Sequence, residues 1–310
     1  MKVKKSKLKF LATLTAVTTV FALFFTSCSD GDGVSAESEG QATVGVTDAA
    51  VDAQNITGVY LAIDEVQAKS NTEIKTIARF DAPKEFNVMA YQNGEVYALA
   101  DGSLATGTYD EIRLILSSEA ESSYVKFKDG TKTALDVPSG STSGYKIKGD
   151  FDIAANAMSN LVVDIDLRKA LVVTGNNTYM LRPTARTIDL RTTGIIKGSV
   201  QKDAFDRTVV YAYAKGTFND AEGDAPAEGQ SRFENSVNSA VVAEDGTFTL
   251  AFMQEGDYEI VVSRYEMNEE KEEYEFKSVV SSNIWLNGSI ANVVSVESNA
   301  TVDLSIDLGL

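Results

Sequence analysis

The only cysteine of the chain, Cys28, is the residue to which the sequence assigns a definite chemistry. It follows Thr26 and Ser27 at the end of an apolar run over residues 10–25, and the residues before that run include five lysines. A basic start, an apolar middle and small residues before a cut are the parts of a secretory signal. A cysteine at this place predicts cleavage before Cys28 and attachment of a diacylglycerol to its thiol. Each buried methylene contributes about 0.8 kcal/mol, so two or more acyl chains hold a protein stably to a membrane.

The residues after Cys28 predict a flexible tether that ends near Gly40, because small polar residues cannot form a core. Ser29, Asp30 and Asp32 also resemble the short acidic signal that sends lipoproteins of Bacteroidetes to the cell surface, although Gly31 interrupts the acidic run. We therefore expect a lipoprotein in the outer membrane that faces the cell exterior. The periplasmic face is the alternative.

The composition excludes several kinds of catalysis. The chain contains no histidine, so Ser-His-Asp triads, histidine metal sites and histidine proton relays cannot form. A lipidated Cys28 leaves no thiol for a disulfide, a nucleophile or a zinc site. With 45 acidic and 28 basic residues, the net charge of −17 repels nucleic acid. We expect no cofactor and no metal, and the remaining candidates for chemistry are carboxylates, Ser/Lys arrangements, tyrosines and oxygen-ligated cations.

Two pairs of aspartates could act as the paired carboxylates of a glycosidase, which lie about 5–9 Å apart. Asp164 and Asp166 share one face of a predicted strand, and so do Asp303 and Asp307. A solvent-facing strand edge is the preferred interpretation, because 45 acidic residues make chance pairs common. The adjacent residues Asp64 and Glu65 point to opposite faces and are not a pair.

Three further features could bind ligands. Residues 30–33 and 219–224 carry oxygen ligands for calcium but lack the spacing of an EF-hand, so flexible loops are the preferred interpretation. Trp285, the only tryptophan, could stack on a sugar, but an aromatic of the core or of a sheet edge is the preferred interpretation. Residues 269–273 read as a solvated hairpin tip or a short helix.

Alternation of apolar and polar residues dominates the first part of the chain and predicts half-buried strands, for example over residues 59–63, 112–116 and 161–167. Asn93-Gly94 and Asp129-Gly130 indicate turns. Residues 84–91 and 95–100 could each hold one or two helical turns.

A second unit begins near Gly194, and residues 216–239 read as a long loop. After it, Asp245-Gly246 predicts the turn before a strand, and Gly256 permits a sharp entry into the next strand. The expected hairpin places five apolar side chains on one face: Phe248, Leu250, Tyr258, Ile260 and Val262. Both units place a Gly-x-Tyr at a strand start, at Gly107 to Tyr109 and at Gly256 to Tyr258, which predicts the same kind of sandwich corner in both.

Residues 41–190 resemble an uncharacterised family, domain of unknown function 4382. The phrases that carry the resemblance are Val46-Thr47-Asp48-Ala49, residues 59–66, residues 86–94, Gly107-Thr108-Tyr109 with residues 112–114, residues 137–147, and residues 164–169 before Leu181-Arg182-Pro183. The family implies a β-sandwich and export, and it has no established catalytic residues to transfer. One departure is Asn87-Val88, where such domains often carry Asp-Leu.

The second unit, with Gly198 and its Asp-Gly-x-Phe and Gly-x-Tyr phrases, resembles carboxypeptidase-regulatory or transthyretin-like sandwiches, a class that is mostly structural or adhesive. The sequence therefore predicts an all-β protein with two consecutive antiparallel β-sandwiches of immunoglobulin or transthyretin type. The predicted divisions are a signal peptide (1–27), a lipidated tether (28–40) and sandwiches over 41–192 and 193–310.

The expected role is that of a non-enzymatic envelope lipoprotein with a binding, adhesive or structural function. Its partners would be the membrane, through the lipid, and a glycan or protein ligand at the cell surface, with no nucleic acid. The oligomeric state stays open. The alternative is a carboxylate-dependent glycan hydrolase or a glycan-import accessory protein.

Overall fold

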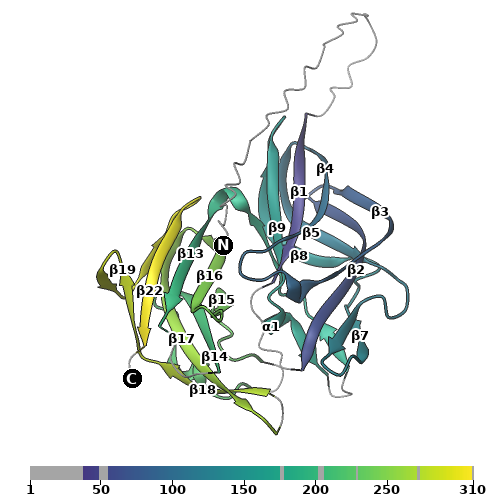
Figure 1. The fold of residues 1–310 in the computed structure, drawn as a ribbon. Coiled ribbons are helices and arrows are strands. Elements are labelled where there is room, and N and C mark those ends of the chain that lie inside the picture. The colour runs from purple at the N-terminus through teal and green to yellow at the C-terminus, as the bar shows by residue number, and fades with distance from the viewer. Residues whose placement is uncertain are drawn as a thin grey trace, which may run out of the picture. The chain divides into compact units, whose positions relative to one another are not determined.

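The structure, a computed structural model, describes residues 38–48, 55–174, 178–201, 206–227, 230–270 and 273–308. Figure 1 shows that nearly every element in these ranges is a strand, and the only α-helix among them is the four-residue α1 (Leu167–Ala170). The all-β fold expected from the alternating sequence is therefore confirmed.

The strands before residue 190 belong to one 12-stranded sheet. They are β1 (Glu39–Thr47), β2 (Ile56–Lys69), β3 (Ile74–Asn87), β4 (Tyr97–Ala105), β5 (Gly107–Leu116), β6 (Tyr124–Phe127), β7 (Lys132–Asp136), β8 (Tyr145–Ile153), β9 (Met158–Asp164), β10 (Leu171–Val173), β11 (Tyr179–Leu181) and β12 (Arg186–Asp189). Their order across the sheet is β10-β11-β7-β6-β2-β5-β8-β12-β9-β1-β4, and β3 pairs with β2.

This sheet curves around a single hydrophobic core. Alternate residues of β1, β2, β5 and β9 face that core, among them Val44, Leu61, Ile112 and Leu161, which are at most 1% exposed. At Gly102 in β4, an added Cβ would lie 2.1 Å from the carbonyl oxygen of Ile77 in β3, so the two strands approach closely there. We call this unit the first sandwich.

The short helices expected around residues 84–100 are largely wrong. Residues 84–87 continue β3, and only Val88–Ala90 form one turn, the 3-10 helix η1. Residues 97–100 begin β4, which pairs with β1. Leu99 is 2% exposed, and the small residues Ala98 and Ala100 lie on either side of it, so pairing with β1 and burial decide the structure in favour of the strand.

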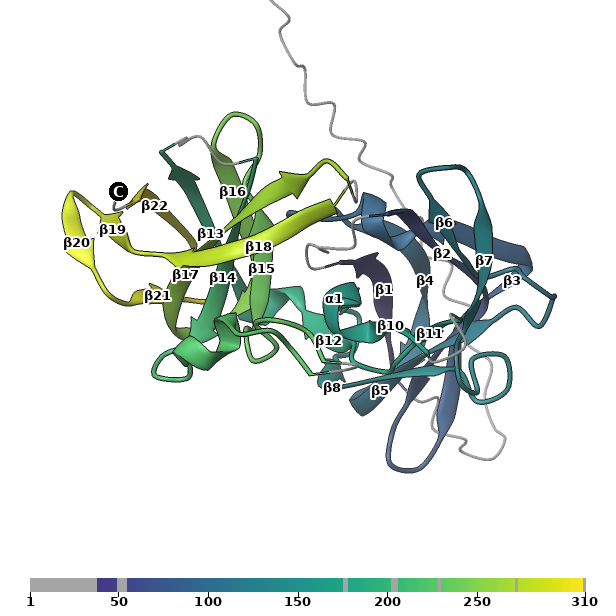
Figure 2. The same cartoon turned by 90° about the horizontal axis from the view of Figure 1, so that it is seen from below.

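The strands after residue 192 form two five-stranded sheets. They are β13 (Thr193–Val200), β14 (Arg207–Ala214), β15 (Asn238–Val241), β16 (Thr247–Gln254), β17 (Gly256–Asn268), β18 (Glu273–Val280), β19 (Ser282–Leu286), β20 (Ser289–Ala291), β21 (Val294–Val296) and β22 (Thr301–Leu308). One sheet has the order β16-β13-β22-β19-β20, and the other has the order β15-β14-β17-β18, with β21 beside β17. We call this unit the second sandwich (Figure 2).

The predicted hairpin over residues 245–262 is wrong in its pairing. β16 pairs with β13, whereas β17 pairs with β14 in the other sheet. The five apolar side chains that were expected to share one face do meet in one core, which also receives Ile196 and Ile306. Two strands bury the same alternate residues in a shared core whether they lie side by side in one sheet or face each other across a sandwich. The sequence pattern therefore does not distinguish the two arrangements.

The expected common corner is confirmed. Tyr109 donates a hydrogen bond of 3.0 Å to the carbonyl oxygen of Ala105, and Tyr258 donates one of 2.7 Å to that of Gln254, four residues upstream in both cases. The glycines two residues before them, Gly107 and Gly256, have φ of +145° and +156°, a region open mainly to glycine.

Most pairings in both sandwiches are antiparallel, but each sandwich opens with a strand that has a parallel neighbour. β1 pairs in parallel with β9, and β13 pairs in parallel with β22. Two shorter parallel pairings join β11 to β7 and β12 to β8.

Candidate functional site

The predicted attachment site lies outside the described residues. This holds for Cys28, for the export residues Ser29, Asp30 and Asp32, and for the calcium candidate over residues 30–33. Among the residues that the structure does describe, no helix has the length and the apolar character needed to cross a bilayer.

Asp164 and Asp166, the carboxylates considered for hydrolysis, each contact a cation of the chain. Asp164, the last residue of β9, accepts a hydrogen bond of 2.9 Å from Nε of Arg186. Asp166, which precedes α1, lies 3.0 Å from Nη2 of Arg168 and 3.3 Å from Nζ of Lys169. Asp164 is 5% exposed, so the solvent-facing edge expected for this pair is wrong.

The environments of these two carboxyls shift their pKa values in opposite directions. Burial raises the pKa of Asp164 in spite of the nearby Arg186 guanidinium. Burial alone would also raise the pKa of Asp166, but the charges of Arg168 and Lys169 lower it. A carboxylate that already accepts hydrogen bonds from its own protein and is closed to solvent is poorly placed to attack or protonate a substrate.

Asp48 is a third buried carboxyl near this pair, and the sequence analysis assigns it no role beyond the family resemblance. Its Oδ1 accepts a hydrogen bond of 3.1 Å from the backbone N–H of Leu167, and its Oδ2 accepts one of 2.9 Å from Nε2 of Gln92. Burial raises its pKa well above the ordinary value, and Asp166 and Asp164 add to the shift. Within the described part of the chain, no three acidic side chains come together to hold a metal ion.

The second aspartate pair is too widely spaced for hydrolysis. Asp303 and Asp307 lie four residues apart in β22, which corresponds to about 13 Å along a strand. Asp303 is exposed and Asp307 is half-buried. The interpretation as a solvated strand face therefore fits Asp303.

Short helix α1 contacts the loop of the second sandwich, and residues 37–310 form one compact unit. Arg168 donates a hydrogen bond of 2.7 Å to the carbonyl oxygen of Phe233, and Lys169 donates one of 2.8 Å to that of Ser236. Ser231 donates in return to the carbonyl oxygen of Arg168. The Arg168 side chain is only 6% exposed. We call these contacts the α1 junction.

The loop over residues 216–237 covers the outer face of β14 and β17 with aromatic side chains. Its Phe233 is 1% exposed and stacks on Tyr211 with ring centroids 4.3 Å apart. The Arg168 guanidinium lies 5.4 Å from the centroid of the same Tyr211 ring. We call this the aromatic layer, and its main members are Tyr211, Tyr213, Phe233, Tyr265 and Phe276.

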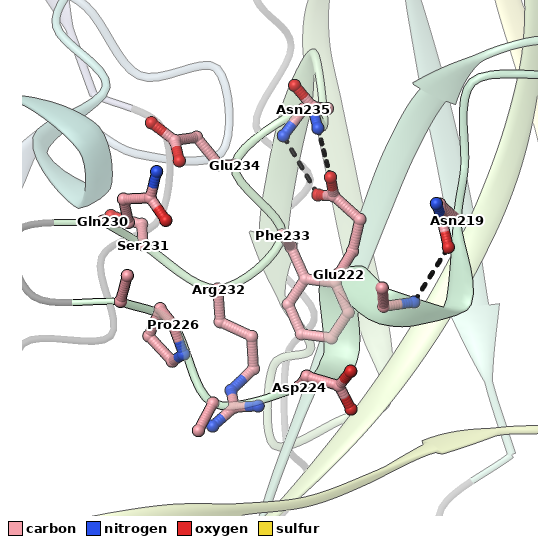
Figure 3. A pocket seen from close by; sticks show the side chains of 13 residues that line it. Asn219, Glu222, Asp224, Pro226, Gln230, Ser231, Arg232, Phe233, Glu234 and Asn235 are labelled. Carbon is pink, nitrogen blue, oxygen red and sulfur yellow. Dashed lines mark hydrogen bonds between the residues drawn. The ribbon is translucent and has the colours of Figure 1, made fainter.

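The loop encloses a hollow of about 300 Å³, which Figure 3 shows with its lining side chains. It includes the calcium candidate at residues 219–224, but those oxygens serve the loop itself. Glu222 accepts hydrogen bonds from the hydroxyl of Tyr213 and from the backbone and side chain of Asn235. Oδ1 of Asn219 accepts a hydrogen bond from the backbone N–H of Ala221 and so caps a 3-10 turn over Asp220–Gly223. These side chains hold the shape of the loop.

A second hollow, of about 450 Å³, lies beside the turn between β6 and β7, and its residues Phe127 and Tyr179 pack against the first core. Its lining residues, which define what we call the aromatic hollow, are Asn55, Phe127, Lys128, Asp129, Thr131, Thr133 and Tyr179. The rings of Phe127 and Tyr179 have centroids 5.5 Å apart and are tilted by 59°. The predicted turn at Asp129-Gly130 joins β6 to β7 on its rim, as expected.

Trp285, considered as a sugar platform, lies half-buried in β19 and lines none of the hollows described above. Phe127 and Tyr179 could not be predicted as site residues from the sequence, because neither belongs to a recognisable motif. The only local signal at the aromatic hollow is the Asp129-Gly130 turn. Residues 269 and 270 belong to the tip between β17 and β18, so the expected hairpin tip is confirmed.

Residues 39–183 match the model of a family described as "Domain of unknown function (DUF4382)", which supports the resemblance seen in the sequence of the first sandwich. No protein with a curated description matches the chain at a significant level.

Several solved structures show a distant likeness. The Bacillus anthracis TIE protein is 8% identical with a TM-score of 0.20, over 87% of this chain and 34% of that one. The chain thus spans about a third of that protein. BcpA, the major pilin subunit of Bacillus cereus, is 10% identical with a TM-score of 0.23, over 87% of this chain and 70% of that one. GBS52, the minor pilin of Streptococcus agalactiae, is 13% identical with a TM-score of 0.20, over 87% and 95%. TM-scores of this size do not establish a shared fold, and the architecture given above rests on the strand pairing.

Proposed function

We propose that this protein is a lipid-anchored lipoprotein of the bacterial outer membrane that faces the cell exterior and has a non-enzymatic binding or structural role. Its first sandwich is a member of the domain of unknown function 4382 family, and its second is a transthyretin-like sandwich. The division into a signal peptide (1–27), a tether (28–40) and sandwiches over 41–192 and 193–310 is part of the proposal.

The observation that carries the non-enzymatic role is the state of the buried carboxylates. Asp164 and Asp166 are the pair that a glycan hydrolase would use, and each contacts a buried or half-buried cation of the same chain. Neither aspartate lines either of the two hollows. A general acid needs access to the leaving-group oxygen, and these side chains have none through those hollows.

The α1 junction supports a structural role, because it holds the two sandwiches together. Its hydrogen bonds join the end of the first sandwich to the loop of the second, and they use a cation that is almost closed to solvent. A hydrogen bond from a charged donor is stronger than a neutral one and contributes more when water is excluded. The two sandwiches would then act as one body at the end of the tether.

Replacement of Cys28 tests the anchor. We expect Cys28→Ala to abolish incorporation of labelled palmitate and to release the protein from the membrane fraction or block its processing. The double variant Asp30→Asn and Asp32→Asn is the matched control, because it keeps the thiol: palmitate should still enter, while protease added to intact cells should no longer cleave the protein. Palmitate in the Cys28→Ala variant contradicts the anchor, and cleavage of the double variant as efficient as that of the wild type contradicts the surface signal.

The non-enzymatic role is tested with the purified lipidated protein. Neutral and acidic polysaccharides should release no reducing ends above the level given by an Asp164→Asn variant. If the wild type releases reducing ends and the Asp164→Asn variant does not, the proposed non-enzymatic role is contradicted.

A further inference from the structure

We propose that the aromatic hollow is a binding site for a neutral sugar ring of a cell-surface or environmental glycan. This inference rests on the proposed binding role and names the ligand class. It places the site between the β6–β7 turn, the start of β2 and the strand β11.

The apolar part of the site comes from two aromatic side chains on different strands. Phe127 ends β6, and Tyr179 begins β11, which lies in parallel beside β7 and places Tyr179 opposite Leu135. Both side chains are half-buried, so part of each remains exposed to solvent. The C–H face of a sugar ring is apolar and packs on such a surface, whereas its hydroxyls need polar partners at the edge.

The polar part of the site surrounds these rings. Asp129, Asn55 and Thr131 supply a carboxylate, an amide and a hydroxyl, and all three side chains are exposed. A carboxylate or a side-chain amide offers two adjacent polar atoms, which matches two neighbouring hydroxyls of a sugar. Because these groups are exposed, the hydroxyls of a sugar can replace the water that they bind.

The chain fixes these polar groups before any ligand arrives. Oδ1 of Asp129 accepts hydrogen bonds of 2.9 Å from the backbone N–H of Thr131 and 2.6 Å from its hydroxyl. The Thr131 hydroxyl lowers the pKa of Asp129, so the carboxylate is ionised at neutral pH. The backbone N–H of Lys128 donates a hydrogen bond of 3.0 Å to the carbonyl oxygen of Asn55, which joins the start of β2 to the turn. Such preorganisation reduces the entropy lost on binding.

Charge and size define the ligand further. The lining includes one carboxylate, that of Asp129, and one ammonium group, that of Lys128, so it carries no net charge and suits a neutral ligand. The hollow of about 450 Å³ falls within the range of about 300–1,000 Å³ typical of small-molecule sites. It suits one or two sugar rings of a longer neutral glycan.

The loop hollow of Figure 3 offers a contrast within the same chain. Glu222 and Asn219 accept hydrogen bonds from their own loop, as Asp129 does from its turn, but the ring of Phe233 is 1% exposed and is not available as a platform. The aromatic hollow is therefore the one of the two that combines half-exposed rings with exposed polar groups.

The test measures binding of the full-length lipidated protein, held in detergent without sugar headgroups, to neutral hexasaccharides of glucose, mannose, galactose and xylose. We expect at least one of the four to bind, and we expect Asp129→Asn and Tyr179→Ala each to weaken that binding by about tenfold or more. Tyr179→Phe should retain most of it, because the ring is kept. Trp285→Phe is the matched control, since it changes an aromatic residue outside the hollow, and it should bind as the wild type does.

Asp129→Asn keeps an oxygen that can accept from Thr131, so it reports on the site even if Tyr179→Ala unfolds. Absence of binding to all four glycans at millimolar concentration overturns the inference, and so does binding that is unchanged in Asp129→Asn and in a folded Tyr179→Ala variant. If palmitate labelling and membrane retention persist while sugar binding fails, the inference alone is lost and the proposed function stands.

Discussion

The two sandwiches cover the outer faces of their central strands with different chemistry. In the first, the outer face of β2, β3, β5 and β8 carries a set of ion pairs that we call the charged ladder, with members Glu65, Arg79, Glu111, Arg113 and Lys148. In the second, the outer face of β14 and β17 carries the aromatic layer. Two of the three cations of the charged ladder stay in solvent, with 72% of the Arg79 side chain and 70% of the Lys148 side chain exposed, whereas the Arg113 side chain is 14% exposed.

The chemistry of each outer face decides whether another part of the chain can pack on it. Cations that remain solvated gain little from being covered, because covering them removes their water. An aromatic layer gains apolar burial when a loop packs on it, and here it also receives the Arg168 guanidinium above the ring of Tyr211. The α1 junction therefore forms on the aromatic face of the second sandwich.

Among substitutions that test this contrast, we expect Arg168→Ala to cause the largest loss in the free energy of unfolding. The substitution leaves the carboxyl of Asp166 buried with Lys169 as its remaining cation, and it removes the hydrogen bond to Phe233. We expect a loss of about 3–5 kcal/mol in the free energy of unfolding, measured by urea denaturation. Arg79→Ala is the matched control in the charged ladder and should cost less than about 1 kcal/mol. Equal losses in the two variants would contradict the contrast between the two faces.

A smaller loss of stability is expected when the tyrosine corner of either sandwich is changed, because each sandwich has a corner of the same kind. Tyr109→Phe and Tyr258→Phe each remove one hydroxyl that donates to a strand-end carbonyl. Each should lower the free energy of unfolding by about 0.5–1.5 kcal/mol, and the two losses should add in the double variant, because the sites share no partner. A double variant whose loss differs clearly from the sum would show that the corners are coupled.

The smallest effect is a change in pH dependence, and its sign should differ between Asp48 and Glu65. Burial raises the pKa of Asp48 in the folded state, so its contribution to stability falls as the pH rises above the unfolded value of about 3.9. Burial alone would raise the pKa of Glu65, but hydrogen bonds from Thr76 and Gln67 and the Arg79 guanidinium lower it. Its contribution is therefore present above about pH 4.3 and is lost as the pH falls.

Urea denaturation between pH 4 and pH 7 measures these signs. Relative to the wild type, Asp48→Asn should become more stable as the pH rises, and Glu65→Gln should become less stable. If the free energies of unfolding of the two variants change with pH in the same way, the environments of the two carboxyls do not differ.

Much of the fold could be predicted from local pattern. The alternation at residues 112–116 and 161–164 marks real strands, and the two Gly-x-Tyr phrases mark real corners. Which strands lie side by side could not be predicted. β16 and β17 show why, because facing strands and paired strands need the same alternation.

The functional surfaces were harder to predict, because they depend on contacts between distant residues. No motif predicts that the Arg168 side chain is buried, because its burial depends on the loop around Phe233, which lies 65 residues further along the chain. The turn at Asp129 could be predicted, but the arrival of Tyr179 beside it follows from the parallel pairing of β11 with β7. No local pattern encodes that pairing.

The parallel pairing that opens each sandwich has a consequence for how the chain folds. Thr43 of β1 bonds Asn160 of β9, 117 residues further along. At a synthesis rate of roughly 5–20 residues per second, the first strand waits about 6–23 s for this neighbour to be made. Contacts of such long range slow folding, and an unpaired strand edge invites association with other chains in the meantime. The order in which the chain is made thus leaves β1 without this neighbour until most of the first sandwich has been made.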